Sequence, residues 1–261
     1  MEFENITFSI EEGIARITLN QPDRRNSLSY EMVKDIEGGI SLAKEKEAKV
    51  LVLTGSGKAF SSGGDMKSMA EGMANPSPES REKILDYYRS ALAVRNVEVP
   101  TIAAINGHAI GAGLTLALAC DIRIAKDGAK MGPTFVQIGL NPGMGTSYLL
   151  QRVVGIGKAC ELIFTASVIE AREAERIGLV NKVVPEENFE EEVMSLASKI
   201  AKGPPLAIRM AKKALRLAQE KDMDTVLEFE SFAQGLCLLT DDLKEGIQAF
   251  FEKREPEFKG K

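Results

Sequence analysis

Apolar and polar residues alternate along the first part of the chain, and uninterrupted apolar runs follow. Alternation over residues 3–10 and 14–19, around Glu11-Glu12-Gly13, predicts a β-hairpin. The other expected elements are a helix at about 29–47, strands at 49–54, 101–105, 122–125 and 129–132, a helix at 111–119, and almost continuous helix from about 145. Residues 65–96 show helical ends and a polar middle that contains proline.

The recurrence of a strand followed by a strand and a helix predicts an α/β fold, a right-handed spiral of ββα units. We expect this core to span residues 1–195 and a helical C-terminal region to span 196–261. Helices expected at 204–220, 222–238 and 241–253 carry dense apolar stripes. Such stripes expose more apolar surface than one small layer buries against itself. They favour subunit association, and packing within one chain is the alternative.

Composition places the chain among globular proteins and excludes few functions. Its 261 residues are 44% hydrophobic and 27% charged, with a net charge of −5 that argues against nucleic-acid binding. Three scattered cysteines lack metal-ligand spacing and are expected to be buried free thiols in a reducing compartment. With no apolar run of about 20 residues and no signal-like start, we expect a cytoplasmic protein with no membrane partner.

Two glycine-bearing segments carry most of the chemical information. They are KAFSSGGDM (Lys58–Met66) and NGHAIGAGLTLALACD (Asn106–Asp121), and each lies between a β-branched apolar run and a helical stretch. A strand that turns through glycine into a helix leaves unpaired backbone N–H groups at the turn. Two such turns can point their N–H groups at one oxygen that is becoming negative.

Alternative explanations exist for each segment. The first is also consistent with a plain strand-to-helix turn, in which Asp65 caps a helix lined by Met66, Met69 and Met73. The second leads into a helix of small and aliphatic residues that must be buried with its positive end inward, which favours function. Neither segment matches a dinucleotide-binding fingerprint or a phosphate-binding Walker loop.

Both segments, in this order and spacing, resemble the crotonase superfamily, the enoyl-CoA hydratase/isomerase family. Four further blocks extend the resemblance over essentially the whole chain: PDRRNSL (22–28), IGLNPGMGTSYLLQRVVG (138–155), TASVIEAREAERIGLVNKVVP (165–185) and AFFEKREPEF (249–258). The resemblance implies a crotonase-like spiral that forms homotrimers or pairs of trimers. It implies an acyl-coenzyme A thioester as ligand, with coenzyme A arriving as part of the substrate, no other cofactor and no metal.

By position in the motifs, the resemblance makes the Gly64 and Ala112 amides an oxyanion hole for the thioester oxygen. It also implies that Arg24 or Arg25 and the backbone from Ala59 to Gly63 hold the nucleotide. Solvated surface charge is the alternative for the basic residues. The full set of expected contacts is Arg24, Arg25, Ala59, Ser61, Ser62, Gly63, Asp65, Met66, Gly111, Thr115, Phe135, Phe250 and Lys253.

The acids that such an enzyme would use are missing. Hydratases of the family place two glutamates where this chain has Thr115 and Phe135, and other members place an aspartate in the loop that here is Asn141-Pro142-Gly143. General acid–base catalysis contributes about 10²–10⁴-fold. Efficient two-glutamate hydration is therefore not expected, and isomerisation or related enolate chemistry fits better.

Other groups near the motifs are candidate substitutes for these acids. His108 is interpreted as structural, and Cys120 has no basic partner in the sequence that would make it a nucleophile. Tyr148, Ser147, Asn141 and Thr134 can present polar atoms, and Glu71 is the nearby acid, for which a solvated helix face is the alternative. The main hypothesis is an enzyme acting on an acyl-CoA. The alternative is a non-catalytic acyl-CoA-binding protein that retains the fold.

Overall fold

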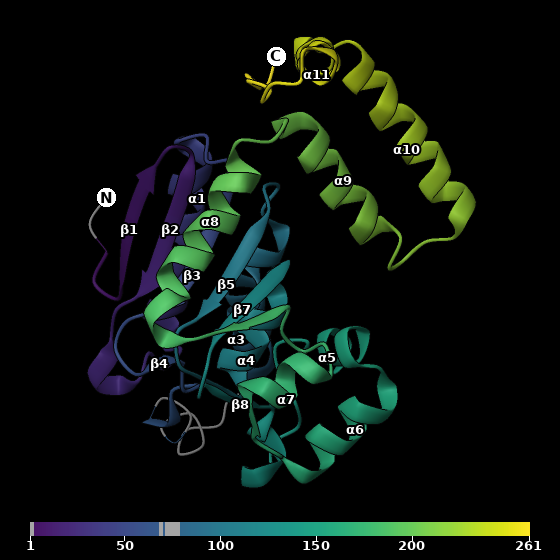
Figure 1. The fold of residues 1–261 in the computed structure, drawn as a ribbon. Helices are drawn as coiled ribbons and strands as arrows, with labels where there is room; N and C mark the ends of the chain where they lie inside the picture. The colour runs from purple at the N-terminus through teal and green to yellow at the C-terminus, as the bar shows by residue number, and fades with distance from the viewer. Residues whose placement is uncertain (1–2, 68–69, 71–78) are drawn as a thin grey trace.

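The computed structural model describes residues 3–67, 70 and 79–261 and contains two sheets (Figure 1). The larger has six strands in the order β1-β2-β3-β5-β7-β10. The bounds of its strands are β1 Ile6–Glu11, β2 Ile14–Leu19, β3 Val50–Gly55, β5 Thr101–Ile105, β7 Ile122–Lys126 and β10 Lys182–Val184. Strands β1 and β2 form the predicted antiparallel hairpin, and the strands from β2 to β10 pair in parallel.

The smaller sheet has four short strands, β4 (Ala59–Ser61), β6 (His108–Ile110), β8 (Lys130–Gly132) and β9 (Ile169–Glu170), in that order. Strand β4 follows β3, β6 follows β5, and β8 follows β7. Each turn of the chain therefore gives one strand to each sheet before a helix returns it. This arrangement confirms the predicted α/β fold of ββα units.

The chain forms helices, some of which cover the two faces of the large sheet. Their bounds are α1 Tyr30–Glu45, α3 Ser80–Ala91, α4 Ala112–Ala119, α5 Thr146–Val154, α6 Ile156–Thr165, α7 Ala171–Arg176, α8 Phe189–Ala201, α9 Pro205–Leu217, α10 Met223–Leu238 and α11 Asp241–Glu252. In β3, Val50 and Val52 pack with α8, whereas Leu51 and Leu53 join the main core with α1 and α4. Both faces of the strand are buried, which is why it reads as an unbroken apolar run.

Some sequence expectations differ from the structure. The chain after 145 is not continuous helix, because β9 and β10 interrupt it and β10 completes the edge of the large sheet. The expected boundary at 195 lies inside α8, where Val193 and Ala197 belong to one buried cluster. The first break in helical structure after that point is the short turn before Pro205. The division into a core at 1–195 and a helical C-terminal region at 196–261 stays a prediction.

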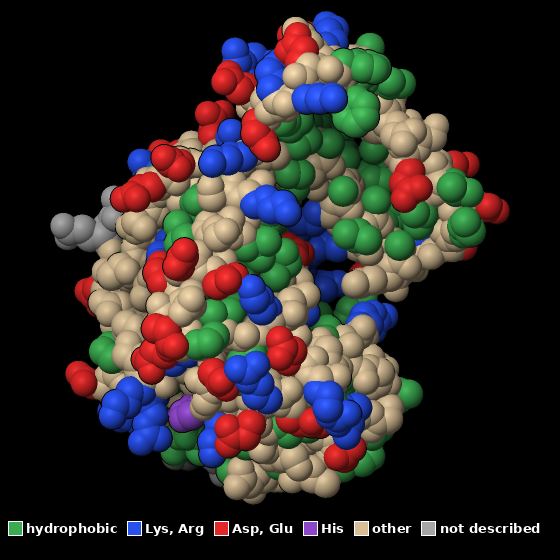
Figure 2. Space-filling model, viewed as in Figure 1, with side chains coloured by type: hydrophobic (Ala, Val, Ile, Leu, Met, Phe, Trp, Pro, Cys, Tyr) green, Lys and Arg blue, Asp and Glu red, His purple; other side chains and the backbone are tan. Residues whose placement is uncertain are grey.

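Helices α9, α10 and α11 form an arm that extends away from the sheets (Figure 1). Large apolar side chains on the arm are exposed, including Leu215, Phe232, Leu239, Phe250 and Phe251. Between α9 and the body lies a cavity of about 540 Å³ whose lining includes Arg95, Arg123, Arg152, Lys212 and Arg216. Figure 2 shows Lys and Arg side chains within this hollow.

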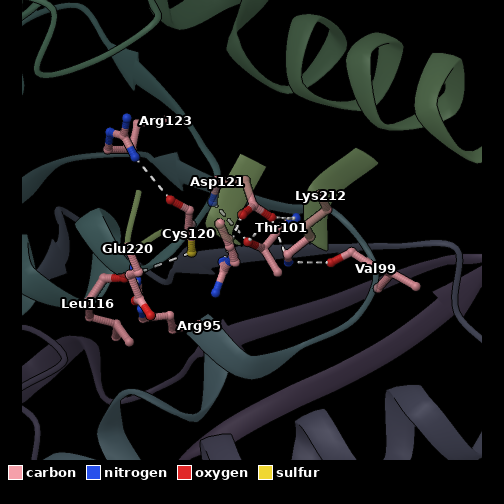
Figure 3. A network of polar contacts seen from close by, with 10 residues as sticks. Arg95, Val99, Thr101, Leu116, Cys120, Asp121, Arg123, Lys212 and Glu220 are labelled. Carbon is pink, nitrogen blue, oxygen red and sulfur yellow. Dashed lines mark hydrogen bonds and ion pairs between the residues drawn. The ribbon is translucent and has the colours of Figure 1, made fainter. Parts of the chain in front are cut away.

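A charged network joins the arm to the body (Figure 3). Asp121, at the end of α4, pairs with Lys212 at 2.7 Å and with Arg216 at 2.8 Å, both on α9. The same carboxylate accepts hydrogen bonds from the backbone N–H and the hydroxyl of Thr101. Burial raises the pKa of Asp121, but Lys212 and Arg216 outweigh burial and hold the pKa below its ordinary value of 3.8.

We expect Asp121→Asn to lower the free energy of unfolding by about 3 kcal/mol, because the nearly buried Lys212 ammonium loses its counter-charge. Since the Asp121 pKa is depressed, its contribution is present above about pH 3.8 and is lost as the pH falls below that value. Urea unfolding at pH 7 and pH 3 measures both effects. Glu161→Gln, in the exposed Lys158–Glu161 pair, is the control and should cost under about 1 kcal/mol. Equal losses for the two variants would contradict the prediction.

Candidate active site

The loop that contains Arg24 and Arg25 is bonded onto the first glycine turn. The Ser62 N–H donates to the Arg25 carbonyl at 2.9 Å, and the Ser61 hydroxyl donates to the Asn26 carbonyl at 2.7 Å. The buried Asn26 amide donates to the carbonyl of Ala59 at 2.8 Å. The structure therefore brings together the residues around 24–26 and 59–63 that the motifs predicted to act together.

The two glycine turns touch through backbone atoms at Gly63. This residue has φ +98°, a conformation that favours glycine. A Cβ built on it would lie 2.7 Å from the Ile110 carbonyl oxygen and 3.4 Å from the Ala112 nitrogen. Such an approach is open only to a residue without a side chain. It places the first turn directly against the start of α4.

Helix α4 begins at the second turn and is buried throughout its eight residues. Gly111, with φ 55° and ψ −120°, precedes it, and its N–H donates to the Gly132 carbonyl at 2.8 Å. A Cβ on Gly113 would lie 2.5 Å from the Ser61 carbonyl oxygen, so this helix also rests on β4. The positive N-terminal end of a helix with no polar face therefore opens at the contact between the turns.

The amides of Gly64 and Ala112 are uncommitted in the part of the chain that the structure describes, where neither donates to a backbone carbonyl. Gly64 forms an isolated parallel bridge with Leu28, whose own N–H donates to the Gly63 carbonyl at 2.7 Å. The Tyr87 hydroxyl donates to the Leu28 carbonyl at 2.8 Å and so supports this turn from α3. Burial raises the pKa of Tyr87, which keeps its phenol protonated.

Thr115, one turn into α4, has a fully buried hydroxyl that is engaged with α5. It lies 2.6 Å from the Thr146 hydroxyl and 3.2 Å from the Gly111 carbonyl. Thr146 in turn donates to the Gly143 carbonyl at 2.6 Å. Because the Thr146 hydroxyl donates to Gly143, the Thr115 hydroxyl is left to donate to the Thr146 oxygen or to the Gly111 carbonyl. Thr115 ties two helices together and has no proton to offer a ligand.

The remaining predicted residues around the turns differ in how far they are buried. Phe135 lies in the 3-10 helix Thr134–Ile138 and packs, half-buried, against the main core. Asp65 is half-buried and Met66 is 58% exposed at the start of a helical turn. Met69, Met73 and the candidate acid Glu71 lie outside the described residues.

The predicted nucleotide contacts fall in two separate places. Arg24 and Arg25 are exposed beside the first turn, where Arg25 adopts the left-handed conformation. Phe250 and Lys253 are exposed at the end of α11, at the opposite end of the molecule from β4 and α4 (Figure 1). The arm points away from the body, so a single chain does not bring these two residues to the site.

Of the polar groups that could replace the missing acids, His108 and Tyr148 are hydrogen-bonded elsewhere and Cys120 is buried. His108 is structural, as expected, since its Nδ1 accepts from the Lys130 N–H at 3.1 Å. Burial raises the pKa of Cys120 to about 12, so its thiol is inert. The Tyr148 hydroxyl donates to Glu220 at 3.0 Å, beyond the end of α9. Asn141 and Ser147 are exposed, and Thr134 lies beside Gly111.

Sequence reasoning missed the residues that α3 contributes. The polar run before this helix hides it, and only the adjacent pair Tyr87-Tyr88, in an otherwise charged segment, could have drawn attention. No group of three His, Cys, Asp or Glu side chains able to hold a metal occurs among the described residues. None of the described helices is long and apolar enough to span a bilayer.

Known proteins share this fold and sequence pattern. The family model for enoyl-CoA hydratase/isomerase matches residues 9–261. A crotonyl-CoA hydratase of Syntrophomonas wolfei is 40% identical over 99% of both chains, and a short-chain-enoyl-CoA hydratase of Clostridium acetobutylicum is 38% identical over 98% of both. The crystal structure of an enoyl-CoA hydratase from Bacillus anthracis superposes with a TM-score of 0.92 at 37% identity, covering 99% of this chain and all of that one. The chain belongs to the enoyl-CoA hydratase/isomerase family of enzymes.

Gly113→Ala is expected to disrupt the site, because its methyl group would have to push α4 away from the Ser61 backbone. We expect a loss of at least about 2 kcal/mol of stability from overpacking, together with loss of acyl-CoA binding. Gly157→Ala is the matched control, since a Cβ there meets nothing within 4 Å. Thermal unfolding and calorimetric titration measure the two properties. Gly113→Ala behaving like Gly157→Ala would contradict the close-contact interpretation.

Proposed function

We propose that this protein transforms an acyl-CoA thioester through an enolate that is stabilised by the Gly64 and Ala112 amides. The observation that carries the proposal is the contact of the two glycine turns at Gly63, with Ala112 as the first residue of a buried helix. Family membership supports the ligand class. Among the described residues the two amides donate to no backbone carbonyl, and the turns that carry them meet at Gly63, as two donors to one developing oxyanion would require.

The environment of these donors strengthens their effect. Helix α4 adds the positive end of its dipole, and its surroundings exclude water because its whole first turn is buried. Amides fixed by a backbone contact need no reorganisation when charge develops on the thioester oxygen. Removing one donor of this kind typically costs about 10²–10³-fold in rate.

The nucleotide end of the ligand would lie along the loop that carries Arg24 and Arg25. Both cations are exposed and the loop is bonded to β4, so they can approach phosphates without leaving a buried charge behind. Phe250 and Lys253 could contribute only from the arm of a second copy. We therefore propose a homo-oligomer, a trimer or a pair of trimers, in which the exposed apolar arm is covered. No cofactor other than the substrate's own coenzyme A is proposed.

The reaction we favour is isomerisation or a related enolate reaction rather than two-carboxylate hydration. Thr115 has no free proton, and Phe135 cannot ionise. The hydratase names of the relatives describe those proteins, and this chain departs from the family pattern at both positions. A non-catalytic acyl-CoA-binding protein is the second candidate, favoured by the same two substitutions.

Ala112→Pro is expected to reduce turnover about 10²–10³-fold while the fold is kept. Proline is well tolerated at the first position of a helix, so the substitution removes the N–H without breaking α4. Ala112→Ser keeps the N–H and should retain activity within a few-fold. Steady-state kinetics with an accepted acyl-CoA, alongside circular dichroism, measure the difference. Equal activity of the two variants would rule out the Ala112 amide as a donor.

A panel of CoA esters separates the candidate functions. The purified protein is expected to bind crotonyl-CoA but to hydrate it at least about 10²-fold more slowly than a two-glutamate hydratase assayed in parallel, since both carboxylates are absent. It should turn over a 3-enoyl-CoA or a malonyl-type ester. Binding without turnover of any ester would favour the non-catalytic candidate. Absence of binding in calorimetry would exclude both candidates.

A further inference from the structure

Helix α3 places a phenol over the loop that joins the 3-10 helix Thr134–Ile138 to α5. A Cβ built on Gly143 would lie 2.5 Å from the Tyr88 hydroxyl oxygen and 3.0 Å from its Cζ. One turn further along α3, Leu92 lies 3.8 Å from the corresponding Cβ position of Gly145. Tyr88 therefore occupies the space that any side chain at 143 would enter, and it fits there because residue 143 is glycine.

This place is linked to the proposed oxyanion hole by consecutive contacts. Thr115 lies about 4.5 Å along the helix axis from Ala112, three residues at 1.5 Å each. The Thr115 and Thr146 hydroxyls are 2.6 Å apart, and Thr146 donates to the Gly143 carbonyl at 2.6 Å. The Tyr88 hydroxyl stands over Gly143 at the end of that path. The phenol is thus connected to the start of α4 by a short series of contacts.

Tyr88 differs from the other tyrosines in combining a half-buried side chain with a hydroxyl that no described residue bonds. The Tyr87 hydroxyl bonds the Leu28 carbonyl, and the Tyr148 hydroxyl bonds Glu220. Tyr30 lies 53% exposed at the start of α1. Among the described residues the Tyr88 hydroxyl has no hydrogen-bond partner. Its side chain is half-buried and packs against the main core.

We propose that Tyr88 is the catalytic acid of this site, and that its phenol protonates the carbon of the enolate. The proposal rests on the acyl-CoA function proposed above. The Tyr88 O–H bond breaks and a C–H bond forms at the enolate carbon, using the enolate's electron pair as the thioester C=O re-forms. The phenolate that remains takes a proton from solvent water, which leaves hydroxide.

The surroundings keep the phenol in its acidic form. Burial raises the pKa of Tyr88, so the group is protonated at neutral pH. The loop from Asn141 to Gly145 has no ionisable side chain. Several neighbouring groups on α3 and the elements packed against it form pairs of their own: Asp86 with Arg89, Lys34 with Glu37 and Ser90, Arg95 with Glu220, and Tyr87 with Leu28. Burial is therefore the main influence on the pKa of the Tyr88 phenol.

Exchange of the α-hydrogens of butyryl-CoA with deuterated water tests the proposal, because it needs only enolate formation and reprotonation. Tyr88→Phe should exchange at least about 10²-fold more slowly than the natural protein, and Tyr30→Phe should match it. Gly143→Ala, which displaces the phenol without removing it, should also slow exchange. Calorimetry with butyryl-CoA should give similar affinities for the natural protein, Tyr88→Phe and Tyr30→Phe.

The pH dependence gives a second readout. Exchange by the natural protein should rise about tenfold per pH unit between pH 7 and 9, since the phenolate is the minor form that removes the α-hydrogen. Tyr88→Phe should exchange at least about 10²-fold more slowly than the natural protein at each pH in this range. Two outcomes with retained binding would overturn the role of Tyr88. One is equal exchange by Tyr88→Phe and the natural protein, and the other is no exchange by either. Loss of binding by the natural protein would instead overturn the acyl-CoA function itself.

Discussion

The close approach of β4 to the start of α4 is the constraint on which the site depends. Gly63 and Gly113 leave room for it, and a side chain at either position would meet backbone oxygen from the other segment. Because the contact is between backbones, it fixes the Gly64 and Ala112 amides more firmly than side chains could. The small sheet, short as its strands are, holds the two turns at this spacing.

Polar side chains around this contact mainly form hydrogen bonds to backbone carbonyls. Asn26 bonds the carbonyls of Ser56 and Ala59, and Ser61 bonds back to the loop that contains Asn26. The Thr115 and Thr146 hydroxyls bond each other between α4 and α5, and Thr146 donates to the Gly143 carbonyl. These bonds hold the described backbone around the site in place. A chemistry based on fixed amides and a single phenol suits such a site better than one based on paired carboxylates.

The large sheet and the main helices could be predicted because their patterns are local. The run at 50–55 is buried on both faces, and Ser29 caps α1 by accepting from the Met32 N–H. Strands β4, β6 and β9 span only two or three residues, which is too few for an alternation of apolar and polar residues to be recognised. The glycine turns were found from composition and spacing. Tyr88 was not, because its position over Gly143 arises only from tertiary packing between residues 55 positions apart in the sequence.

The Thr115–Thr146 tether also bears on how such a site can change over evolutionary time. A glutamate at 115 would add a carboxylate to a fully buried helix and remove the hydroxyl that links α4 to α5. Gain of the acid and loss of the tether would come in one step, so compensating changes on α5 would have to accompany it. In this structure, gain of a carboxylate at 115 and loss of the link between α4 and α5 would therefore be one and the same event.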